Sequence, residues 1–260
     1  MFAIISDIHS NLEALTTVLA DIEQRGIKKI FCLGDVIGYG PNPRECLDLV
    51  MEKCELCVIG NHDFGVLYEP TNFNFSAEQA SFWTRKTLED EPEKELRDKR
   101  WQFLGSLTMR KMIESKGVGD SGNMKISLLH ASPRKPINEY VFPNDVYTNP
   151  AKIKLMFERV EHICFIGHTH IPGVFFDEPD FYTPDELGDE YPLLTDEKAI
   201  INVGSVGQPR DKDNRASYAY IKDNKVHFVR LEYDIEATAK KIFDIKPLDD
   251  YQGERLREGR

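Results

Sequence analysis

The sequence predicts an α/β fold built around a largely parallel β-sheet. Short apolar runs alternate with helical patterns through the first third of the chain, which is the order of right-handed βαβ units. The composition, 41% hydrophobic and 30% charged, is that of an ordinary globular protein. A chain of 260 residues has room for one large domain, or for one domain that carries an insertion.

The individual elements have recognisable starts and ends. Ser10 and Glu13 match a capping box at the start of the first helix, and Asn42 with Pro43 matches the cap and first position of the second. Apolar residues then recur at helical or strand spacing. The expected strands are Phe2–Ser6, Lys29–Leu33, Leu56–Ile59, Lys125–Leu129, His162–Ile166, Ala199–Val203, Ala216–Ile221 and Val226–Leu231, with helices at 12–26, from 43, from 150 and near 235–243, and a hairpin turn at Asp223–Asn224.

A charged helical stretch interrupts this pattern after the third strand. Residues 76–115 have helical character, Ser76 and Gln79 match a capping box, and the glycine-rich segment 117–123 ends the stretch. We interpret 64–124 as a helical insertion in a single domain over 1–245. A charged tail at 246–260, frayed from 249 onward, and an acidic excursion at 177–197 complete the prediction.

Charge and cysteine usage exclude several classes of protein. With 33 Lys and Arg against 44 Asp and Glu, the net charge of −11 disfavours binding to polymeric nucleic acid. A pair of divalent cations would restore about +4 locally, so a small phosphorylated ligand is still compatible. The sequence has neither an apolar run of about 20 residues nor a signal-peptide pattern, which predicts no membrane span. Five cysteines without framework spacing favour the cytoplasm, and Cys54 and Cys57 are expected to be packing residues.

Polar side chains follow five of the predicted strands, at the point where each strand ends. The ligand crevice of an open α/β sheet lies at the carboxyl ends of its strands, so these side chains should converge on one site. They occur in the segments D-I-H, G-D-V-I-G, G-N-H-D, a single histidine and G-H-T-H, which contain Asp7, His9, Asp35, Asn61, His62, Asp63, His130, His168 and His170.

The residue types in these segments indicate a metal site. Each segment alone is compatible with a turn or a core histidine, but their conjunction favours ligation. Carboxylate, imidazole and amide donors without cysteine suit Mn, Fe, Zn, Ni or Co better than a closed structural zinc site. The donors are too many for one ion and a fitting number for two. Two ions about 3.5–4 Å apart can activate a water for in-line phosphoryl displacement.

The ordered blocks D-x-H, G-D, G-N-H-D, a lone His and G-H-x-H resemble the calcineurin-like metallophosphoesterases. The segments S-D-I-H-S-N, G-D-V-I-G-Y-G-P-N-P and N-V-G-S-V-G-Q-P-R-D resemble its small bacterial and archaeal phosphodiesterase branch, which includes diadenosine-tetraphosphatase-like proteins. The resemblance covers about 1–63, 126–175 and 199–232. It implies a four-layer αββα sandwich with two mixed β-sheets flanked by helices.

The resemblance also implies residue roles. Two divalent cations, with manganese expected first, would hold a shared hydroxide that attacks phosphorus directly. His62 would protonate the leaving oxygen, and Asp63 would orient its ring and keep it charged near neutral pH. The implied ligands are Asp7, His9 and His170 for the first metal, Asn61, His130 and His168 for the second, and Asp35 as the bridge.

We therefore expect a hydrolase that cleaves a phosphodiester or phosphomonoester bond of a small molecule or nucleotide. The alternatives are a serine/threonine-type protein phosphatase with the same chemistry and a non-catalytic binding scaffold. Arg210 is a candidate phosphate contact, with a salt bridge to Asp211 as the alternative, and Asn11 is a second candidate at a helix N-terminus. The aromatic residues of the insertion are compatible with a homo-oligomer.

Overall fold

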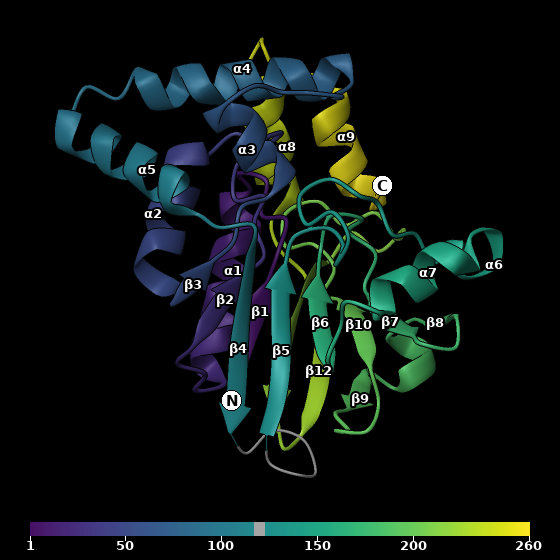
Figure 1. Ribbon diagram of the computed structural model, residues 1–260. Helices are drawn as coiled ribbons and strands as arrows, with labels where there is room; N and C mark the ends of the chain where they lie inside the picture. The colour runs from purple at the N-terminus through teal and green to yellow at the C-terminus, as the bar shows by residue number, and fades with distance from the viewer. Residues whose placement is uncertain (117–122) are drawn as a thin grey trace.

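The computed structural model describes residues 1–116 and 123–260, and its α/β architecture confirms the predicted fold class (Figure 1). The break predicted at 117–123 falls almost entirely outside the described residues. The helices are α1 (Leu12–Gln24), α2 (Pro43–Lys53), α3 (Asn61–Leu67), α4 (Phe75–Glu89), α5 (Lys94–Ser106), α6 (Asp145–Thr148), α7 (Pro150–Phe157), α8 (Ile235–Phe243) and α9 (Tyr251–Glu258), with a 3-10 turn at Asp185–Leu187. The strands are β1 (Phe2–Ile5), β2 (Ile30–Cys32), β3 (Leu56–Cys57), β4 (Arg110–Lys116), β5 (Asn123–Leu129), β6 (Ile163–Ile166), β7 (Gly173–Phe176), β8 (Asp180–Tyr182), β9 (Glu190–Pro192), β10 (Ala199–Asn202), β11 (Ala216–Lys222) and β12 (Lys225–Leu231).

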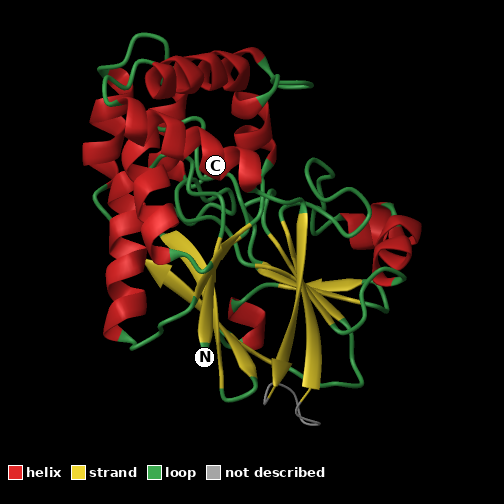
Figure 2. Ribbon diagram, turned by 60° about the vertical axis from the view of Figure 1, so that its left-hand side comes forward, coloured by secondary structure: helices red, strands yellow, loops and turns green. Residues whose placement is uncertain are grey.

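Two mixed sheets face each other between layers of helices (Figure 2). One has the order β3-β2-β1-β11-β12-β9 and the other β4-β5-β6-β10-β7-β8. Strands β1, β2 and β3 are parallel, as are β5, β6 and β10, while β11 joins β1 in antiparallel register. The carboxyl ends of both parallel sets therefore lie at the same end of the sandwich, below α3, α4, α8 and α9.

Strand β1 shows that its sheet is covered on both faces, because its side chains enter two different hydrophobic cores. Phe2 and Ile4 point into the core between the sheets, where they meet residues such as Phe165. Ala3 and Ile5 point the other way, into the core under α1 and α2. Successive side chains of a strand project to opposite faces, so a continuous apolar run is what a doubly covered strand requires.

The helical prediction for 76–115 is wrong at its carboxyl end. Helix α5 ends at Ser106, and Arg110–Lys116 forms the edge strand β4, which pairs in antiparallel register with β5. Ile113 packs against the core between the sheets, while charged side chains occupy much of the strand. Charged residues protect a sheet edge, and the same residues also suit the solvent face of a helix. The composition of this segment therefore could not separate the two structures.

Two of the predicted capping residues are also wrong. The cap of α1 is Asn11, whose Oδ1 accepts from the N–H of Ala14 at 3.1 Å, and not Ser10. The cap of α4 is Asn74, whose Oδ1 accepts from the N–H of Ala77 at 2.9 Å, and not Ser76. Asparagine caps as well as serine does, so the choice depends on where the incoming loop lets the helix begin.

The last residues form an ordered helix instead of a frayed tail. Gln252 and Leu256 of α9 are buried, and Leu256 packs in a small core with Tyr39, Ala77 of α4 and Ile242 of α8. The excursion at 177–197 also contains structure, because β8 extends one sheet and β9 the other. Strand β7 is a further element that the sequence did not indicate. No helix in the described ranges has the length and apolar character of a membrane span.

Candidate metal centre

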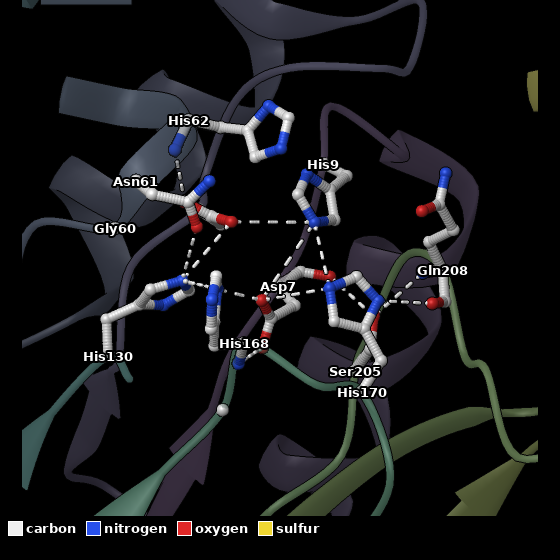
Figure 3. A network of polar contacts seen from close by, with 12 residues as sticks. Asp7, His9, Gly60, Asn61, His62, His130, His168, His170, Ser205 and Gln208 are labelled. Carbon is white, nitrogen blue, oxygen red and sulfur yellow. Dashed lines mark hydrogen bonds and ion pairs between the residues drawn. The ribbon is translucent and has the colours of Figure 1, made fainter. Parts of the chain in front are cut away.

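The strand-end residues predicted as ligands meet at one buried site between the two sheets (Figure 3). Five of them, all except Asn61 and His130, adopt a left-handed backbone conformation in the loop that follows their strand. The φ angles are 54° at Asp7, 49° at His9, 51° at Asp35, 66° at His168 and 61° at His170. Non-glycine residues rarely adopt positive φ, and such strain is concentrated at functional sites.

One group of donors consists of Asp7, His9 and His170. The Nε2 atoms of His9 and His170 lie 3.2 Å apart, and Asp7 Oδ1 lies 3.2 Å from His170 Nε2. All three side chains are buried. These separations match those between neighbouring ligand atoms around one cation with bonds near 2.1 Å.

A second group forms around His130. Its Nε2 lies 3.0 Å from Asn61 Oδ1, 3.1 Å from His168 Nδ1 and 3.3 Å from Asp35 Oδ2. Asp35 Oδ2 also lies 3.7 Å from His9 Nε2, so this carboxylate faces both groups. The structure thus brings Asp35 to the position between the two donor sets.

The donor chemistry of both groups fits a metal ion. His130 Nδ1 donates to the carbonyl of Leu33 at 2.9 Å, and His170 Nδ1 donates to the carbonyl of Gln208. With the proton on Nδ1, each ring directs the lone pair of Nε2 at other lone pairs. Lone pairs that point at one another repel unless a cation binds between them. A backbone carbonyl that accepts from the far nitrogen is the usual support of a histidine that binds a metal.

The two carboxylates are held in the same way. Asp7 Oδ2 accepts from the N–H of His168 at 2.9 Å, and Asp35 Oδ1 accepts from the N–H of His62 at 2.8 Å. One oxygen of each group is thereby engaged by backbone, and the other faces the imidazoles. Within residues 1–116 and 123–260, the buried Asp7 Oδ1 has no hydrogen-bond partner.

Charges within the cluster support ligation. Burial opposes the charged form of His130, yet the carboxylates of Asp35 and Asp7 raise its pKa to about 9, which shows that this position favours a positive charge. Burial lowers the pKa of His9 and His168, and neighbouring imidazoles add to the effect. These two rings therefore present neutral nitrogen atoms, which is the form that binds a metal.

His62 lies beside the donor groups in an aromatic environment. Its ring centroid lies 4.3 Å from that of Tyr39, 4.6 Å from that of Phe73 and 4.9 Å from that of His9. Burial lowers the pKa of His62 to about 4, and the charge of Arg210 acts in the same direction. The side chains around His62 therefore favour its neutral form, whereas the expected proton transfer needs the charged imidazole.

Asp63 has a different role from the one expected. Its Oδ2 accepts from the N–H groups of Asp35 and Gly60 at 2.7 and 3.0 Å, and its Oδ1 accepts from those of Val36 and Ile37 at 3.0 and 3.2 Å. His62 Nδ1 has no hydrogen-bond partner in the described part of the chain. Asp63 therefore organises the loop that carries Asp35 instead of orienting the ring of His62.

Gly60 allows this loop to approach α3 closely. A Cβ at Gly60 would lie 2.0 Å from Asp35 Oδ1 and 2.3 Å from the backbone N of Asp35. Atoms in real structures do not approach this closely, so a residue with a side chain would displace Asp35. The glycine of G-N-H-D is thus part of the site for steric reasons.

The two candidate phosphate contacts differ. Asn11 Nδ2 donates to the carbonyl of Gly207 and to the hydroxyl of Tyr233, at 2.8 and 3.2 Å, so its donors are used in packing α1 against its neighbours. We do not retain Asn11 as a phosphate contact.

The guanidinium of Arg210 donates to Gln208 Oε1 at 2.7 Å, with its Cζ 5.8 Å from the Tyr39 ring centroid. The alternative salt bridge is also wrong, because Asp211 pairs with Arg230.

Sequence reasoning missed the residues that support the ligands from the outside. Ser205 Oγ donates to the carbonyl of Asp7 at 2.8 Å, and Asn202 Nδ2 donates to the carbonyl of Gly167 at 2.7 Å. The ring of Tyr140 stacks on that of His168 with centroids 4.1 Å apart. The segment N-V-G-S-V-G-Q-P-R-D was a visible signal for Asn202 and Ser205, whereas nothing in the sequence pointed to Tyr140.

A cavity of about 520 Å³ opens above the site and is lined by Tyr39, His62, Phe73, Tyr140 and His168 among others. A second cavity of about 280 Å³ adjoins it beside Asn61. Substrate can therefore reach the donor groups from the side of α3 and of the loop at 135–140.

Comparisons with known proteins give independent information about the family and the fold. The model of the calcineurin-like phosphoesterase superfamily domain matches residues 1–225. An uncharacterized protein of Methanocaldococcus jannaschii is 44% identical over 268 residues, which cover 100% of this chain and 98% of that protein. The crystal structure of a metallophosphoesterase from Sphaerobacter thermophilus is 34% identical, with a TM-score of 0.80 over 100% of this chain and 99% of that one. A hypothetical protein from Pyrococcus horikoshii shares the fold, with 18% identity and a TM-score of 0.75 over 100% and 99% of the two chains.

Proposed function

The chain belongs to the calcineurin-like phosphoesterase superfamily and is a metal-dependent phosphoester hydrolase, and we propose that it uses two divalent cations to transfer the phosphorus of a small ester directly to water. The observation that carries the proposal is the arrangement of two donor groups on either side of Asp35. When bound, the cations would supply an activated water and neutralise charge on the phosphoryl oxygens. Manganese is our first choice of ion.

Each donor group would hold one cation. Asp7, His9 and His170 would bind the first, and Asn61, His130 and His168 would bind the second, with Asp35 shared. Backbone bonds to the far oxygens and nitrogens orient four of these side chains before any ion arrives, namely those of Asp7, Asp35, His130 and His170. This preorganisation is what a site needs in order to stabilise charge that develops during the reaction.

His62 would donate the proton to the leaving oxygen, in the charged form that the negative charge of a bound phosphate would favour. Its ring lies beside His9 and at the wall of the large cavity, outside the two donor groups. When the P–O bond breaks, the departing alkoxide takes this proton and leaves as an alcohol, while the oxygen of water stays on phosphorus. A positioned general acid of this kind contributes typically 10²- to 10⁴-fold to the rate.

Arg210 would contact a non-bridging oxygen of the phosphate. Its guanidinium makes no ion pair within the described part of the chain, and its charge acts on His9, His62, His168 and His170. A cation held by a neutral amide keeps its charge available for an anionic ligand.

The size of the cavities favours a small molecule or nucleotide as the substrate over a phosphoprotein or a polymer. The site borders cavities of about 520 and 280 Å³, and the larger volume lies in the range typical of small-molecule sites. The net charge of −11 opposes binding to nucleic acid. A cytoplasmic location fits the five cysteines, each of which lies in the described residues as a free thiol.

Metal analysis combined with an assay tests the proposal. Protein purified without chelator should contain close to two transition metals per chain and should hydrolyse bis-p-nitrophenyl phosphate with added Mn²⁺. Asp35→Ala should lose both metals and the activity, whereas Asp244→Ala, at an exposed helix end, should retain them. Full metal content in Asp35→Ala would contradict the bridging role. Metal content without hydrolysis of any phosphate ester would indicate the scaffold alternative instead.

A further inference from the structure

We propose that the cavity beside Asn61 is a subsite for the leaving group of the substrate and that it takes an aromatic alcohol, either a nucleoside or an aryl alcohol. The proposal rests on the proposed hydrolase function and adds to it the class of substrate. The cavity has a volume of about 280 Å³, and its walls include Phe64, Phe73, Met109, Pro136 and Ile137.

The position of this cavity relative to the site assigns it to the leaving group. It shares Asn61, Phe73 and Lys135 with the larger cavity above the donor groups, so the two cavities are direct neighbours. Phe73 also packs on the ring of His62, with centroids 4.6 Å apart. The group that leaves with a proton from His62 therefore departs on the side where this cavity begins.

The walls of the cavity suit a flat apolar group attached to a phosphate. Two phenylalanine rings, a methionine and a proline offer stacking and sulfur contacts to an aromatic ring. Lys135 is exposed at the junction of the two cavities and makes no ion pair within the described ranges, so its ammonium group can face the phosphate end of the ligand. A short polar alcohol would leave the apolar wall in contact with water.

Esters that differ only in the leaving alcohol test the subsite. The Mn²⁺-loaded enzyme is assayed with benzyl and ethyl phosphates, as monoesters and as symmetric diesters, by release of the alcohol. The wild type should have a kcat/KM for the benzyl ester that is about tenfold or more above that for the ethyl ester. An assay with adenosine 5′-phosphate distinguishes the two classes of leaving group. A kcat/KM above that for benzyl phosphate indicates that the subsite binds nucleosides, and a lower kcat/KM indicates that it binds smaller aryl alcohols.

A matched pair of variants localises the effect. Met109→Glu places a charge in the cavity wall and should reduce the benzyl preference to near one, while Met112→Glu should leave it unchanged. Met109 and Met112 have nearly the same exposure, 50% and 49%, but only Met109 lines the cavity. Equal kcat/KM for benzyl and ethyl esters in the wild type, or a preference that survives in Met109→Glu, would overturn the subsite. Absence of hydrolysis of every ester, bis-p-nitrophenyl phosphate included, would instead refute the proposed function.

A separate set of hydrogen bonds carries a second inference: Gln252 of α9 is a positioning residue for Arg210. Arg210 Nη2 donates to Gln208 Oε1 at 2.7 Å, and Gln208 Nε2 donates to Gln252 Oε1 at 3.1 Å. Gln252 Nε2 then donates to Ser76 Oγ at 2.7 Å. The relay thus connects the C-terminal helix and α4 with the candidate phosphate contact, although the family model ends at residue 225.

The chemistry of the relay permits one orientation of its amides. The guanidinium has only donors, so Gln208 must turn its oxygen toward Arg210 and its nitrogen toward Gln252. Both glutamines are 2% exposed, and water therefore does not replace a lost partner easily. Removal of the acceptor on Gln252 would leave the buried nitrogen of Gln208 unpaired and would loosen the orientation that holds Arg210.

Binding of inorganic phosphate and steady-state kinetics test this inference, which rests on the proposed phosphate role of Arg210. Gln252→Leu should weaken phosphate binding and raise KM about five- to tenfold, with kcat and metal content nearly unchanged. Gln252→Glu keeps an acceptor for Gln208, so its KM should stay closer to that of the wild type than the KM of Gln252→Leu, although its buried charge should lower the melting temperature. In an Arg210→Met background, Gln252→Leu should have no further effect on phosphate binding.

Three results would overturn this positioning role. One is an equal loss of phosphate affinity on Gln252→Leu with and without Arg210. Another is a fall in metal content in Gln252→Leu, which would indicate general disruption of the site. The third is unchanged phosphate binding in Arg210→Met. If Gln252→Leu does not fold, Ser76→Ala removes the far end of the relay and should give a smaller change in KM of the same kind.

Discussion

The two halves of the site are built in different ways. The carboxylates and imidazoles of the donor groups around Asp35 follow strand ends and are buried, and Asp7, Asp35, His130 and His170 are held by bonds to backbone amides and carbonyls. The wall around His62 and the cavities comes from α3, α4 and the loop at 135–142, where aromatic side chains are half-buried or exposed. Tyr140 is 45% exposed although it stacks on a candidate ligand, His168.

This difference separates the chemistry from the choice of substrate. Backbone that is bonded on both sides cannot shift without loss of several contacts, so the donor groups tolerate little change. The wall consists of side chains that can be exchanged while the backbone stays in place. Substitutions in the donor half should therefore affect all substrates, and substitutions in the wall should affect some more than others.

The largest expected effect comes from a single methyl group in the donor half. Gly60→Ala should abolish hydrolysis and metal binding, because its Cβ would occupy the position of Asp35 Oδ1. Metal content and bis-p-nitrophenyl phosphate hydrolysis are the measurements. Gly105→Ala is the control, since a Cβ there meets nothing within 4 Å. An active, metal-loaded Gly60→Ala enzyme would show that the donor half is less rigid than we infer.

His62 lies at the boundary between the two halves, and its replacement should separate chemistry from metal binding. His62→Ala should keep the metals but lose about 10²- to 10⁴-fold in kcat on esters with poor leaving groups. The loss should be much smaller for a p-nitrophenyl ester, whose leaving group does not need a proton. A uniform loss for both kinds of ester would remove His62 from the role of proton donor.

Metal should stabilise the donor half and leave the wall unaffected. Since cations would bind only the folded cluster, Mn²⁺ at 100 times its Kd should add about 2.7 kcal/mol to the free energy of unfolding. The melting temperature should rise by roughly 5–10 °C in a scanning calorimeter. Asp35→Ala should show no such rise, and an equal rise in that variant would place the stabilising ions elsewhere.

The smallest effect is expected in the wall. Tyr140→Leu removes a ring that stacks on His168 and should change kcat/KM by up to about tenfold, in line with the energy of an aromatic pair. Metal content should not change. Tyr140→Phe keeps the ring and should resemble the wild type. If Tyr140→Leu loses metal, the wall and the donor half are coupled more tightly than the contacts indicate.

Much of the fold followed from local patterns. The run F-A-I-I, the helix from residue 12 and the turn at Asp223–Asn224 are each specified by neighbours in the chain, and the turn has the positive φ values, 51° and 58°, that the prediction required. Strand β4 was mistaken for helix because an exposed charged edge has no apolar periodicity to distinguish it. Helix α9 was mistaken for a tail because α4, one of the two helices it packs against, lies far away in the sequence, and the neighbouring helix α8 alone gave no sign of the contact.

The sequence by itself determined which donors are available and that they follow strand ends, because side-chain chemistry and strand direction are local properties. Only the tertiary structure decided what each residue touches. Asp63 was expected to face the neighbouring ring of His62, yet it binds the amides of a loop 26 to 28 residues away. Gln252 reaches Arg210 through Gln208, which lies 44 residues from it in the chain. Such contacts depend on how sheets and helices pack against one another, and the periodic patterns of the sequence do not predict that packing.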